Sequence, residues 1–247
     1  MSVETEEELQ ALKAVGRLVA EAIRAMRRAV RPNTTTLELD AIAGKVFRRA
    51  GARSGPQLDY DFPGVTCISV NDEAVHGIPG KRRLREGDLV KLDVTAELDG
   101  FYADSCVSVS VGRPRREVAD LTSASERALA GGLDVARAGA PLNAIGAVIE
   151  RTVQDAGFSV CAELIGHGIG RKIHEPPDVP SYFDPELTQP LTDGLVLTVE
   201  PIIASGNGRV RGSRDGWTVR TADGSTSAHF EHTIVVREGA PLILTTL

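Results

Sequence analysis

The stretch EGDLVKLDVTAELDGFYADSCVSVSVG (86–112) contains two aspartates whose carboxylates could meet. Asp99-Gly100 is a strong signal for a two-residue type I′ turn, and this turn fixes the register of the two strands around it. In that register Asp93 and Asp104 share one face of the hairpin as diagonal neighbours about 7–8 Å apart. Carboxylates this close repel each other, and a divalent cation between them would remove the repulsion. Two solvated aspartates on an exposed face explain the pattern equally well. The opposite face is apolar, with Val90, Leu92, Val94, Val107, Val109 and Val111.

Two further carboxylates interrupt apolar runs of β-strand character. Glu200 lies in GLVLTVEPII (194–203) and Glu231 lies in SAHFEHTIVV (227–236). A glutamate among valine, leucine and isoleucine is costly to bury unless it is paired or bound to a metal. The alternative for each is an edge strand whose glutamate faces water. Four carboxylates of this kind on strands favour a shared site over four separate surface charges.

Two histidines flank a glycine-rich segment, GHGIGRKIHE (166–175). A dinucleotide-binding loop needs a helix after its glycines, and Pro176-Pro177 exclude one here. The lysine spacing of a Walker loop and the H-E-x-x-H helix of zinc peptidases are also absent from the sequence. His167 and His174 therefore lie in extended or turning chain, and VHGIPG (75–80) presents His76 in a similar way. A lone histidine is usually structural, but this grouping favours a site.

The candidate ligands combine four carboxylates with at least one imidazole. Such a set suits Mn, Fe, Co or Zn rather than a sulfur-rich zinc site. Four carboxylates exceed the three protein ligands that one catalytic zinc commonly takes. They suit two ions about 3.5–4 Å apart, a pair that generates hydroxide at neutral pH and polarises a carbonyl. The sequence therefore favours hydrolysis. The candidates are Asp93, Asp104, Glu200, Glu231 and one or more of His76, His167 and His174.

The elements that hold these residues follow an order that occurs twice: a long helix, a shorter helix ending in Ala-Gly, and strands. Thr35 and Glu38 form a capping-box pattern for the first shorter helix, which ends at Gly51. We interpret the repeat as one α+β domain built from two similar lobes. We expect helices over 3–30, 36–50, 116–138 (weakened at Gly131-Gly132) and 142–156, a loop over 52–66, strands over 67–112 and after 157, and lobes of about 1–112 and 113–247.

Composition excludes several classes of protein. The 247-residue chain carries a net charge of −6, and no basic stripe alternates with aromatic residues, which argues against nucleic-acid binding. Its apolar stretches are shorter than the roughly 18 residues of a membrane span, and its N-terminus, MSVETEEELQ, is too acidic for a signal peptide. Cys67, Cys106 and Cys161 lie far apart, which favours reduced thiols in a cytoplasmic protein.

In their order and spacing the motifs resemble those of type I methionine aminopeptidases, which have the pita-bread metallopeptidase fold. The resemblance covers essentially the whole chain, including the eleven-residue spacing of Asp93 and Asp104 and the seven-residue spacing of His167 and His174. It implies two similar α/β lobes with an antiparallel sheet and an internal pseudo-twofold axis, in agreement with the two-lobe interpretation. The motifs are VHGIPG, KLDVTAELDGFYADS, GHGIGRKIHEPP, LTVEPI, DGWTV and SAHFEHTIVV.

The resemblance also implies a role for each matching residue. Asp104 and Glu231 would bridge two divalent ions (Co, Mn, Fe, Zn or Ni), with His167 and Glu200 on one ion and Asp93 on the other. Glu200 would also take the proton of the attacking water.

Two further histidines and three pocket residues complete the implied site. His174 would hydrogen-bond the substrate carbonyl and stabilise the oxyanion, and His76 would assist proton transfer or orient the substrate. Phe62, Cys67 and Trp217 would line the methionine pocket, where sulfur and aromatic groups suit a thioether; core packing is the alternative for Phe62 and Cys67. His229 and His232 receive no role, although His229 shares the face of Glu231.

The implied function is removal of the initiator methionine from nascent proteins whose second residue is small. Hydroxide generated by the dinuclear metal pair would attack the first peptide bond. The expected partner is the N-terminus of a nascent chain, with no direct nucleic-acid or membrane binding. A ribosome contact is compatible with such a substrate, although the sequence shows no motif for one. We expect a cytoplasmic monomer.

The sequence departs from the family pattern at two positions. Three alternative functions were compared with this interpretation. Family members usually carry an aromatic residue where this chain has Asp59, and often one where it has Ile173, and both positions lie near the substrate. A proline-directed aminopeptidase or prolidase would carry an additional N-terminal domain, for which we expect no room. A non-catalytic binding protein of this fold would lack metal ligands. If the chain were an unrelated small-molecule metallohydrolase, the match of its motifs to the family would be accidental. The chain also lacks the long insertion of type II enzymes and a zinc-finger extension.

Overall fold

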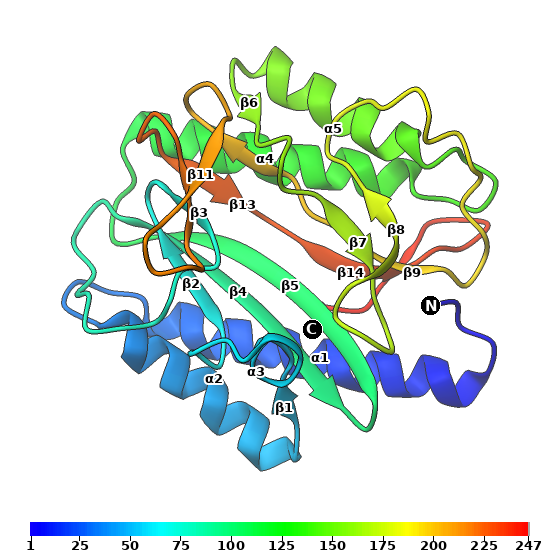
Figure 1. Ribbon diagram of the computed structural model, residues 1–247, viewed down its shortest axis with the longest axis horizontal. Coiled ribbons are helices and arrows are strands. Elements are labelled where there is room, and N and C mark those ends of the chain that lie inside the picture. Colours follow the sequence, from blue (N-terminus) through cyan, green and yellow to red (C-terminus); the bar gives the residue numbers. More distant parts are fainter. Residues whose placement is uncertain (247) are drawn as a thin grey trace.

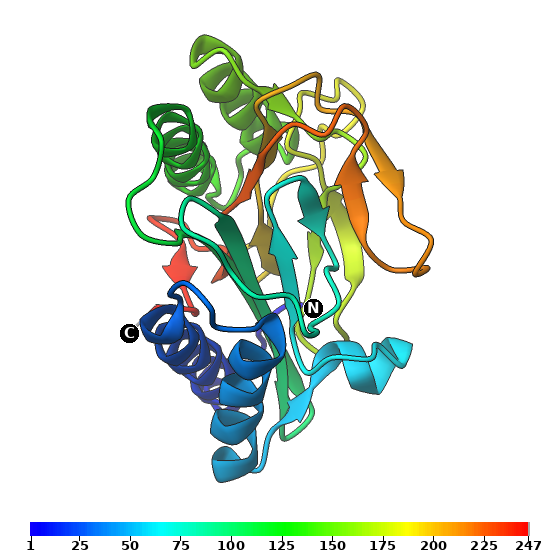
Figure 2. The ribbon, with the colours of Figure 1, turned by 90° about the vertical axis from the view of Figure 1, so that its left-hand side faces the viewer.

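Helices cover one side of the strands in the computed structural model, which describes residues 1–246. α1 (Glu6–Ala29) and α2 (Thr36–Ala50) lie at one end of the molecule, and α4 (Arg116–Val135) and α5 (Asn143–Asp155) lie at the other (Figure 1). Figure 2 shows that these four helices lie on the same side and leave the opposite side of the strands open. The remaining elements are α3 (Gly55–Tyr60), β1 (Arg53–Ser54), β2 (Cys67–Val70), β3 (Glu73–Val75), β4 (Leu89–Leu98), β5 (Phe101–Ser110), β6 (Ser159–Val160), β7 (Gly166–Gly168), β8 (Glu175–Val179), β9 (Val196–Val199), β10 (Ile202–Ala204), β11 (Val210–Gly212), β12 (Val219–Thr221), β13 (Ser227–His229), β14 (His232–Val235) and β15 (Leu242–Ile243).

The first two helices begin and end where their capping residues predict. The Thr5 side chain accepts a hydrogen bond from the backbone of Glu8 in α1. α2 begins with the complete capping box of Thr35 and Glu38 and ends at Gly51, whose φ of 72° is left-handed. Both helices bury their apolar sides in one core cluster with β2, β4 and β5. The predicted helices over 3–30 and 36–50 are confirmed to within a few residues.

β4 and β5 form the hairpin that the sequence predicts. Asp99 and Gly100 have φ values of 51° and 84°, the positive values that a type I′ turn requires. Asp93 pairs with Cys106 and Thr95 pairs with Asp104, which is the expected register. The two aspartates therefore share one face, while the valines and leucines of the other face belong to the core beside α1.

Antiparallel pairing joins the strands of the described residues into several small sheets. β4 pairs with β1, β2 and β5, and a second sheet has the order β15-β14-β9-β7-β8. Two three-stranded sheets have the orders β13-β10-β6 and β11-β12-β3. Helices and antiparallel strands are thus segregated within each half, as the α+β class requires. A second core cluster lies beneath α4 and α5, and the division into lobes at residue 112 stays a prediction.

Two local predictions are wrong. The expected loop over 52–66 contains β1, which pairs with β4, and the six-residue helix α3. Ser54 caps α3 through the backbone of Gln57, and Pro56 occupies the first turn, where a missing N–H costs nothing. Gly131-Gly132 do not weaken α4; a Cβ at Gly131 would lie 2.8 Å from Val148 Cγ1, so the glycines let α5 pack closely.

In the described part of the chain, no helix has the length and apolar composition needed to cross a membrane.

Candidate metal centre

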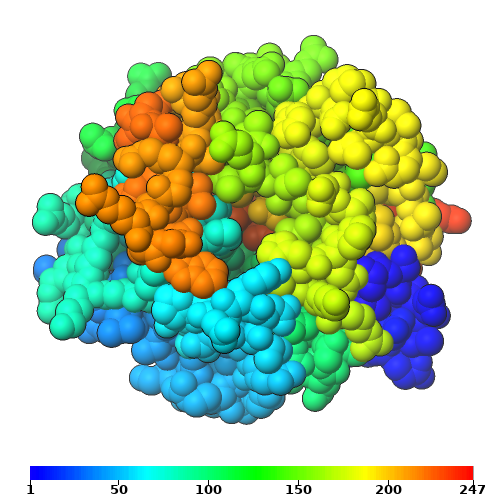
Figure 3. Space-filling model, in the orientation of Figure 1, coloured from blue at the N-terminus to red at the C-terminus, as the bar shows by residue number. Residues whose placement is uncertain are grey.

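All ten residues that the sequence predicts for the site line a single cavity of about 780 Å³. The space-filling view shows a central hollow bordered by cyan, yellow-green and orange segments, which are far apart in the sequence (Figure 3). The tertiary structure therefore brings every predicted candidate to the same place, on the side that the helices leave open. These residues are Phe62, Cys67, His76, Asp93, Asp104, His167, His174, Glu200, Trp217 and Glu231.

Three of these residues come together as a cation would require. Asp104, His167 and Glu231 each offer one ligand atom, and the three atoms lie within 4.8 Å of one another. Glu200 adjoins this group, because its Oε1 lies 3.6 Å from His167 Nε2. Asp93 lies on the same hairpin face and on the wall of the same cavity.

The glutamates lie where their strands are interrupted. Glu200 separates β9 from β10, and Glu231 separates β13 from β14. Only 8% of Glu200 and 2% of Glu231 is exposed to solvent. The alternative of edge strands with glutamates facing water is therefore wrong, and the carboxylates point inward at breaks in the strand ladder.

Burial makes this cluster electrostatically costly. Desolvation raises the pKa of Asp104 to about 6 and the pKa of Glu200 to about 8. Desolvation, and then the charge of Asp104, hold the pKa values of Asp93 and Glu231 well above their usual range. Carboxylates gathered in this way need protons or a cation.

The donor atoms fit a divalent cation. Asp104 Oδ1 and Glu231 Oε1 are fully buried and find no hydrogen-bond partner among residues 1–246. Burial lowers the pKa of His167 to about 4, so its imidazole is neutral at pH 7. Since a carbonyl oxygen can only accept, His167 Nδ1 donates to Gly168 O at 2.9 Å, and Nε2 keeps a free lone pair. Carboxylate oxygens and one imidazole lone pair are the ligand set that the sequence predicts.

His229 is a site residue to which the sequence analysis gave no role. It is 3% exposed, and its Nε2 lies 3.6 Å from Glu231 Oε2 and 3.8 Å from Glu200 Oε2. Neither ring nitrogen has a hydrogen-bond partner within the described chain. The sequence feature that could have placed His229 in the site is its two-residue spacing from Glu231. His232, in contrast, bonds Thr245 through Nδ1, in keeping with a structural role.

His76 occupies a strained backbone position. Its φ of 56° lies in the left-handed region, which costs a non-glycine residue about 1–2 kcal/mol. Gly77 follows and donates its N–H to Ser69 Oγ at 3.0 Å, and a Cβ there would lie 2.3 Å from the Ile68 carbonyl oxygen. Thr218 donates its hydroxyl to the His76 carbonyl at 3.5 Å. Contacts with β2 and with the segment before β12 therefore hold this turn.

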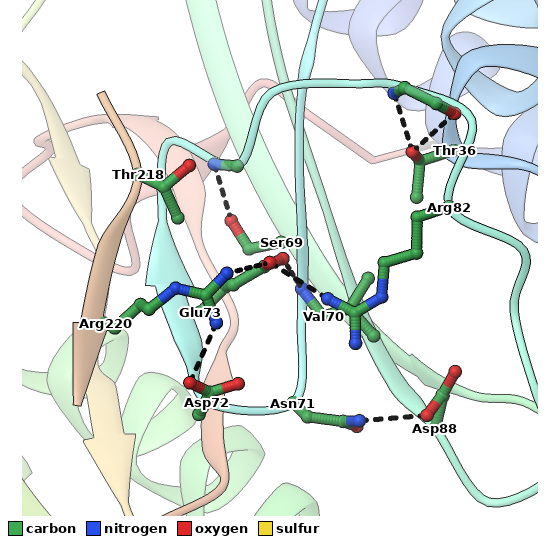
Figure 4. A network of polar contacts seen from close by, with 12 residues as sticks. Thr36, Ser69, Val70, Asn71, Asp72, Glu73, Arg82, Asp88, Thr218 and Arg220 are labelled. Atoms are coloured by element: carbon green, nitrogen blue, oxygen red, sulfur yellow. Dashed lines mark hydrogen bonds and ion pairs between the residues drawn. The ribbon is translucent and has the colours of Figure 1, made fainter. Parts of the chain in front are cut away.

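A partly buried ionic network around Glu73 fixes the strand that leads into His76 (Figure 4). Glu73 Oε2 accepts from the Val70 backbone N–H at 2.7 Å, and its Oε1 accepts from Arg82 at 2.9 Å and from Arg220 at 2.6 Å. Arg220 also donates to Asp72 at 2.8 Å. Since β3 runs from Glu73 to the residue before His76, this network ties the His76 turn to β12.

Replacing Arg220 by leucine is expected to lower the free energy of unfolding by about 2 kcal/mol, because hydrogen bonds to buried charged groups contribute about 1.5–3 kcal/mol. Urea denaturation measures this loss. Arg211 is its cross-strand neighbour and is exposed, so Arg211→Leu serves as the matched control, with an expected change below about 0.5 kcal/mol. Equal stabilities of the two variants would contradict the role of the network.

Aromatic and sulfur side chains line the cavity beside the candidate metal ligands. Phe62 and Trp217 pack edge to face with ring centroids 5.2 Å apart, and Cys67 is a buried thiol opposite Asp93 in the sheet. Of the two departures from the family pattern, Ile173 lines the cavity. Asp59 instead accepts a hydrogen bond from the Tyr102 hydroxyl at 2.8 Å, which gives this carboxylate a structural contact.

Comparison with known proteins finds relatives along the full length of the chain. The model of metallopeptidase family M24 matches residues 10–238. Methionine aminopeptidase 2 of Bacillus subtilis (strain 168) is 42% identical over 249 residues, which cover 100% of each chain. The crystal structure of methionine aminopeptidase from Rickettsia prowazekii has a TM-score of 0.95 at 37% identity and covers 99% of this chain and 100% of its own. The corresponding enzyme from Thermotoga maritima has a TM-score of 0.97 at 34% identity, with 100% of each chain covered.

Proposed function

This chain belongs to metallopeptidase family M24 and has its pita-bread fold, and we propose that it is a methionine aminopeptidase. It removes the N-terminal initiator methionine from proteins whose second residue is small. One observation carries this proposal: a buried cluster of carboxylates and histidine faces an aromatic and sulfur-containing pocket within the same cavity. The cluster supplies hydrolytic chemistry, and the pocket suits a thioether side chain.

Five residues would hold two divalent ions. They are Asp93, Asp104, His167, Glu200 and Glu231, which line the same cavity and would supply the ligand atoms. Bound there, the two ions would lower the pKa of a water molecule and polarise the carbonyl of the first peptide bond. The lone pair of His167 Nε2 and the unpartnered oxygens of Asp104 and Glu231 support this assignment. The chemistry of the ligands fits Co, Mn, Fe, Zn or Ni.

The remaining polar residues bind the substrate and move protons. Glu200 accepts a hydrogen bond from Thr198 through Oε1 at 2.8 Å, which leaves Oε2 to receive the proton of the attacking water. His174 donates to the substrate carbonyl oxygen, and His76 orients the scissile amide. Phe62, Cys67 and Trp217 surround the methionine side chain. The motifs of the chain support type I. The partner that we propose is the N-terminus of a nascent chain, and we propose a cytoplasmic monomer that acts close to the ribosome.

Stability of the metal-free protein is expected to fall as the pH rises from about 4 to about 8. The carboxyl groups have pKa values near 4 in the unfolded chain, whereas burial raises the pKa of Asp104 to about 6 and that of Glu200 to about 8. The folded state therefore binds more protons in this interval, and the free energy of unfolding decreases with pH. The stabilisation from these bound protons is complete below the pKa of the carboxyl groups in the unfolded chain. It is lost as the pH rises through the pKa values of the same groups in the folded protein.

Divalent ions should reverse this trend, because they compete with protons for the same oxygens. We therefore expect the gain in Tm on adding Mn to grow between about pH 5 and about pH 8. Thermal unfolding with chelator and with Mn, over that range, measures both effects. An equal gain in Tm at every pH would show that Mn binds elsewhere.

Methionine release from short peptides tests the proposed function. Met-Ala-Ser, Met-Lys-Ser and Ala-Pro-Ser peptides are incubated with Co or Mn and then with chelator. Metal-dependent cleavage of Met-Ala-Ser alone is the expected result. Cleavage of Ala-Pro-Ser alone would instead assign the chain to the proline-directed branch of the fold. Lack of cleavage with either metal would contradict the proposed activity.

A further inference from the structure

We propose that Tyr60 is a positioning residue for the reaction: its hydroxyl fixes the His174 imidazole in the tautomer that carries its proton on Nε2. The Tyr60 hydroxyl oxygen lies 2.6 Å from His174 Nδ1, although the two residues are 114 positions apart. This inference rests on the proposed function, since it specifies how His174 can donate to a substrate carbonyl.

The geometry is that of a hydrogen bond rather than of stacked rings. The centroids of the two rings are 5.5 Å apart and their planes are inclined at 55°. Both residues line the cavity, and the His174 ring also contacts the His167 ring, with centroids 4.2 Å apart. The contact therefore lies beside the candidate metal ligands, on the side where the substrate would enter.

Chemistry decides which group donates. A phenol loses its proton near pH 10, far more readily than a neutral imidazole N–H, so the phenol is the stronger donor. The imidazole nitrogen that carries no proton is the better acceptor of the pair. Tyr60 therefore donates to Nδ1, and the single proton of the neutral ring lies on Nε2. That nitrogen is the one left for a ligand in the cavity.

Asp59 holds α3 so that Tyr60 can make this contact. Its Oδ1 accepts from the Tyr102 hydroxyl at 2.8 Å, and its Oδ2 accepts from the Ile173 backbone N–H at 3.4 Å. One carboxylate thus joins the end of α3 to β5 and to the residue before His174. The departure from an aromatic residue at position 59 places an anchor next to the residue that orients His174.

The tautomer matters because an oxyanion needs a fixed donor. A histidine free to exchange tautomers presents a lone pair to the carbonyl oxygen for part of the time, which repels the developing negative charge. Removing the Tyr60 hydroxyl should therefore slow turnover while leaving substrate affinity almost unchanged. Contacts that orient metal-ligating side chains are typically worth about 10–100-fold, and we expect an effect of similar size for this contact to His174.

The kinetic test compares Tyr60→Phe with wild type on Met-Ala-Ser. We expect kcat to fall about 10-fold or more, with KM changed less than about 3-fold. Tyr182→Phe is the matched control, because Tyr182 is also partly exposed to solvent and its carbonyl oxygen lies against Gly146 of α5. In a His174→Ala background, Tyr60→Phe should cause no further loss, since it acts through that ring. A wild-type kcat in Tyr60→Phe, or a full further loss in the double variant, would overturn the inference.

A spectroscopic test identifies the tautomer of His174 without turnover of a substrate. Nitrogen-15 NMR of histidine-labelled, zinc-loaded protein distinguishes a protonated from an unprotonated ring nitrogen, and His174→Gln assigns the signals. We expect the Nε2–H form in wild type and a mixture in Tyr60→Phe. An Nδ1–H form in wild type, or an unchanged tautomer in Tyr60→Phe, would refute the role of Tyr60. Because this readout needs no substrate, it remains decisive even if the peptides show that the proposed activity is wrong.

Discussion

Replacing Asp104 by asparagine is expected to abolish metal-dependent turnover while leaving the fold intact or slightly more stable. The substitution keeps the shape of the side chain and removes one negative charge from a cluster of buried carboxyl groups. The backbone is held independently, since Asp104 N–H donates to Thr233 Oγ1 at 2.9 Å and Thr233 donates back to Asp104 O at 2.7 Å. Loss of this carboxylate from the proposed metal site would remove several kcal/mol of transition-state stabilisation, on the order of 1000-fold in rate.

Calorimetry and thermal unfolding separate the two effects of this substitution. Titration with Mn should show at least one site weakened or lost, and the gain in Tm on adding Mn should shrink. The metal-free variant should melt at or above the wild-type temperature, because fewer like charges are buried. Asp120→Asn, on the exposed surface of α4, is the control and should behave as wild type. Turnover close to wild type in Asp104→Asn would contradict the two-metal assignment.

Gly168→Ala is expected to damage the site by geometry rather than by charge. A Cβ at Gly168 would lie 2.2 Å from the Pro176 carbonyl oxygen and 2.7 Å from the Glu175 carbonyl oxygen, both on the adjacent strand. Backbone atoms cannot rotate away, so β7 and β8 must separate. His167 precedes this glycine and His174 precedes β8, so the proposed metal ligand and the proposed substrate-binding histidine would both move.

The expected loss is about 3 kcal/mol in the free energy of unfolding, together with most of the activity. Gly212→Ala is the matched control, because this strand glycine has free space where its Cβ would lie. Its stability should change by less than about 0.5 kcal/mol. Urea denaturation and peptide hydrolysis on both variants make the comparison. A stable, active Gly168→Ala protein would show that the two strands can separate without cost to the site.

The sequence by itself determined the features that depend on neighbouring residues. The Asp99-Gly100 turn fixes the β4–β5 register, and with it the shared face of Asp93 and Asp104. The capping box of Thr35 and Glu38 fixes where α2 begins. In each case the residues that interact lie close together along the chain, so local propensity and the final fold agree. The motifs, read together, also predicted the family and ten of the residues that line the cavity.

The tertiary structure alone decided which neighbours each side chain acquires across the chain. Glu200 and Glu231 could have faced water, and the packing of distant strands buries them. The Tyr60–His174 hydrogen bond joins residues 114 positions apart, and only the packing of the strands places the His229 ring beside Glu200 and Glu231. Contacts between such distant residues depend on how whole helices and strands pack. The types of residues adjacent in the sequence do not determine that packing.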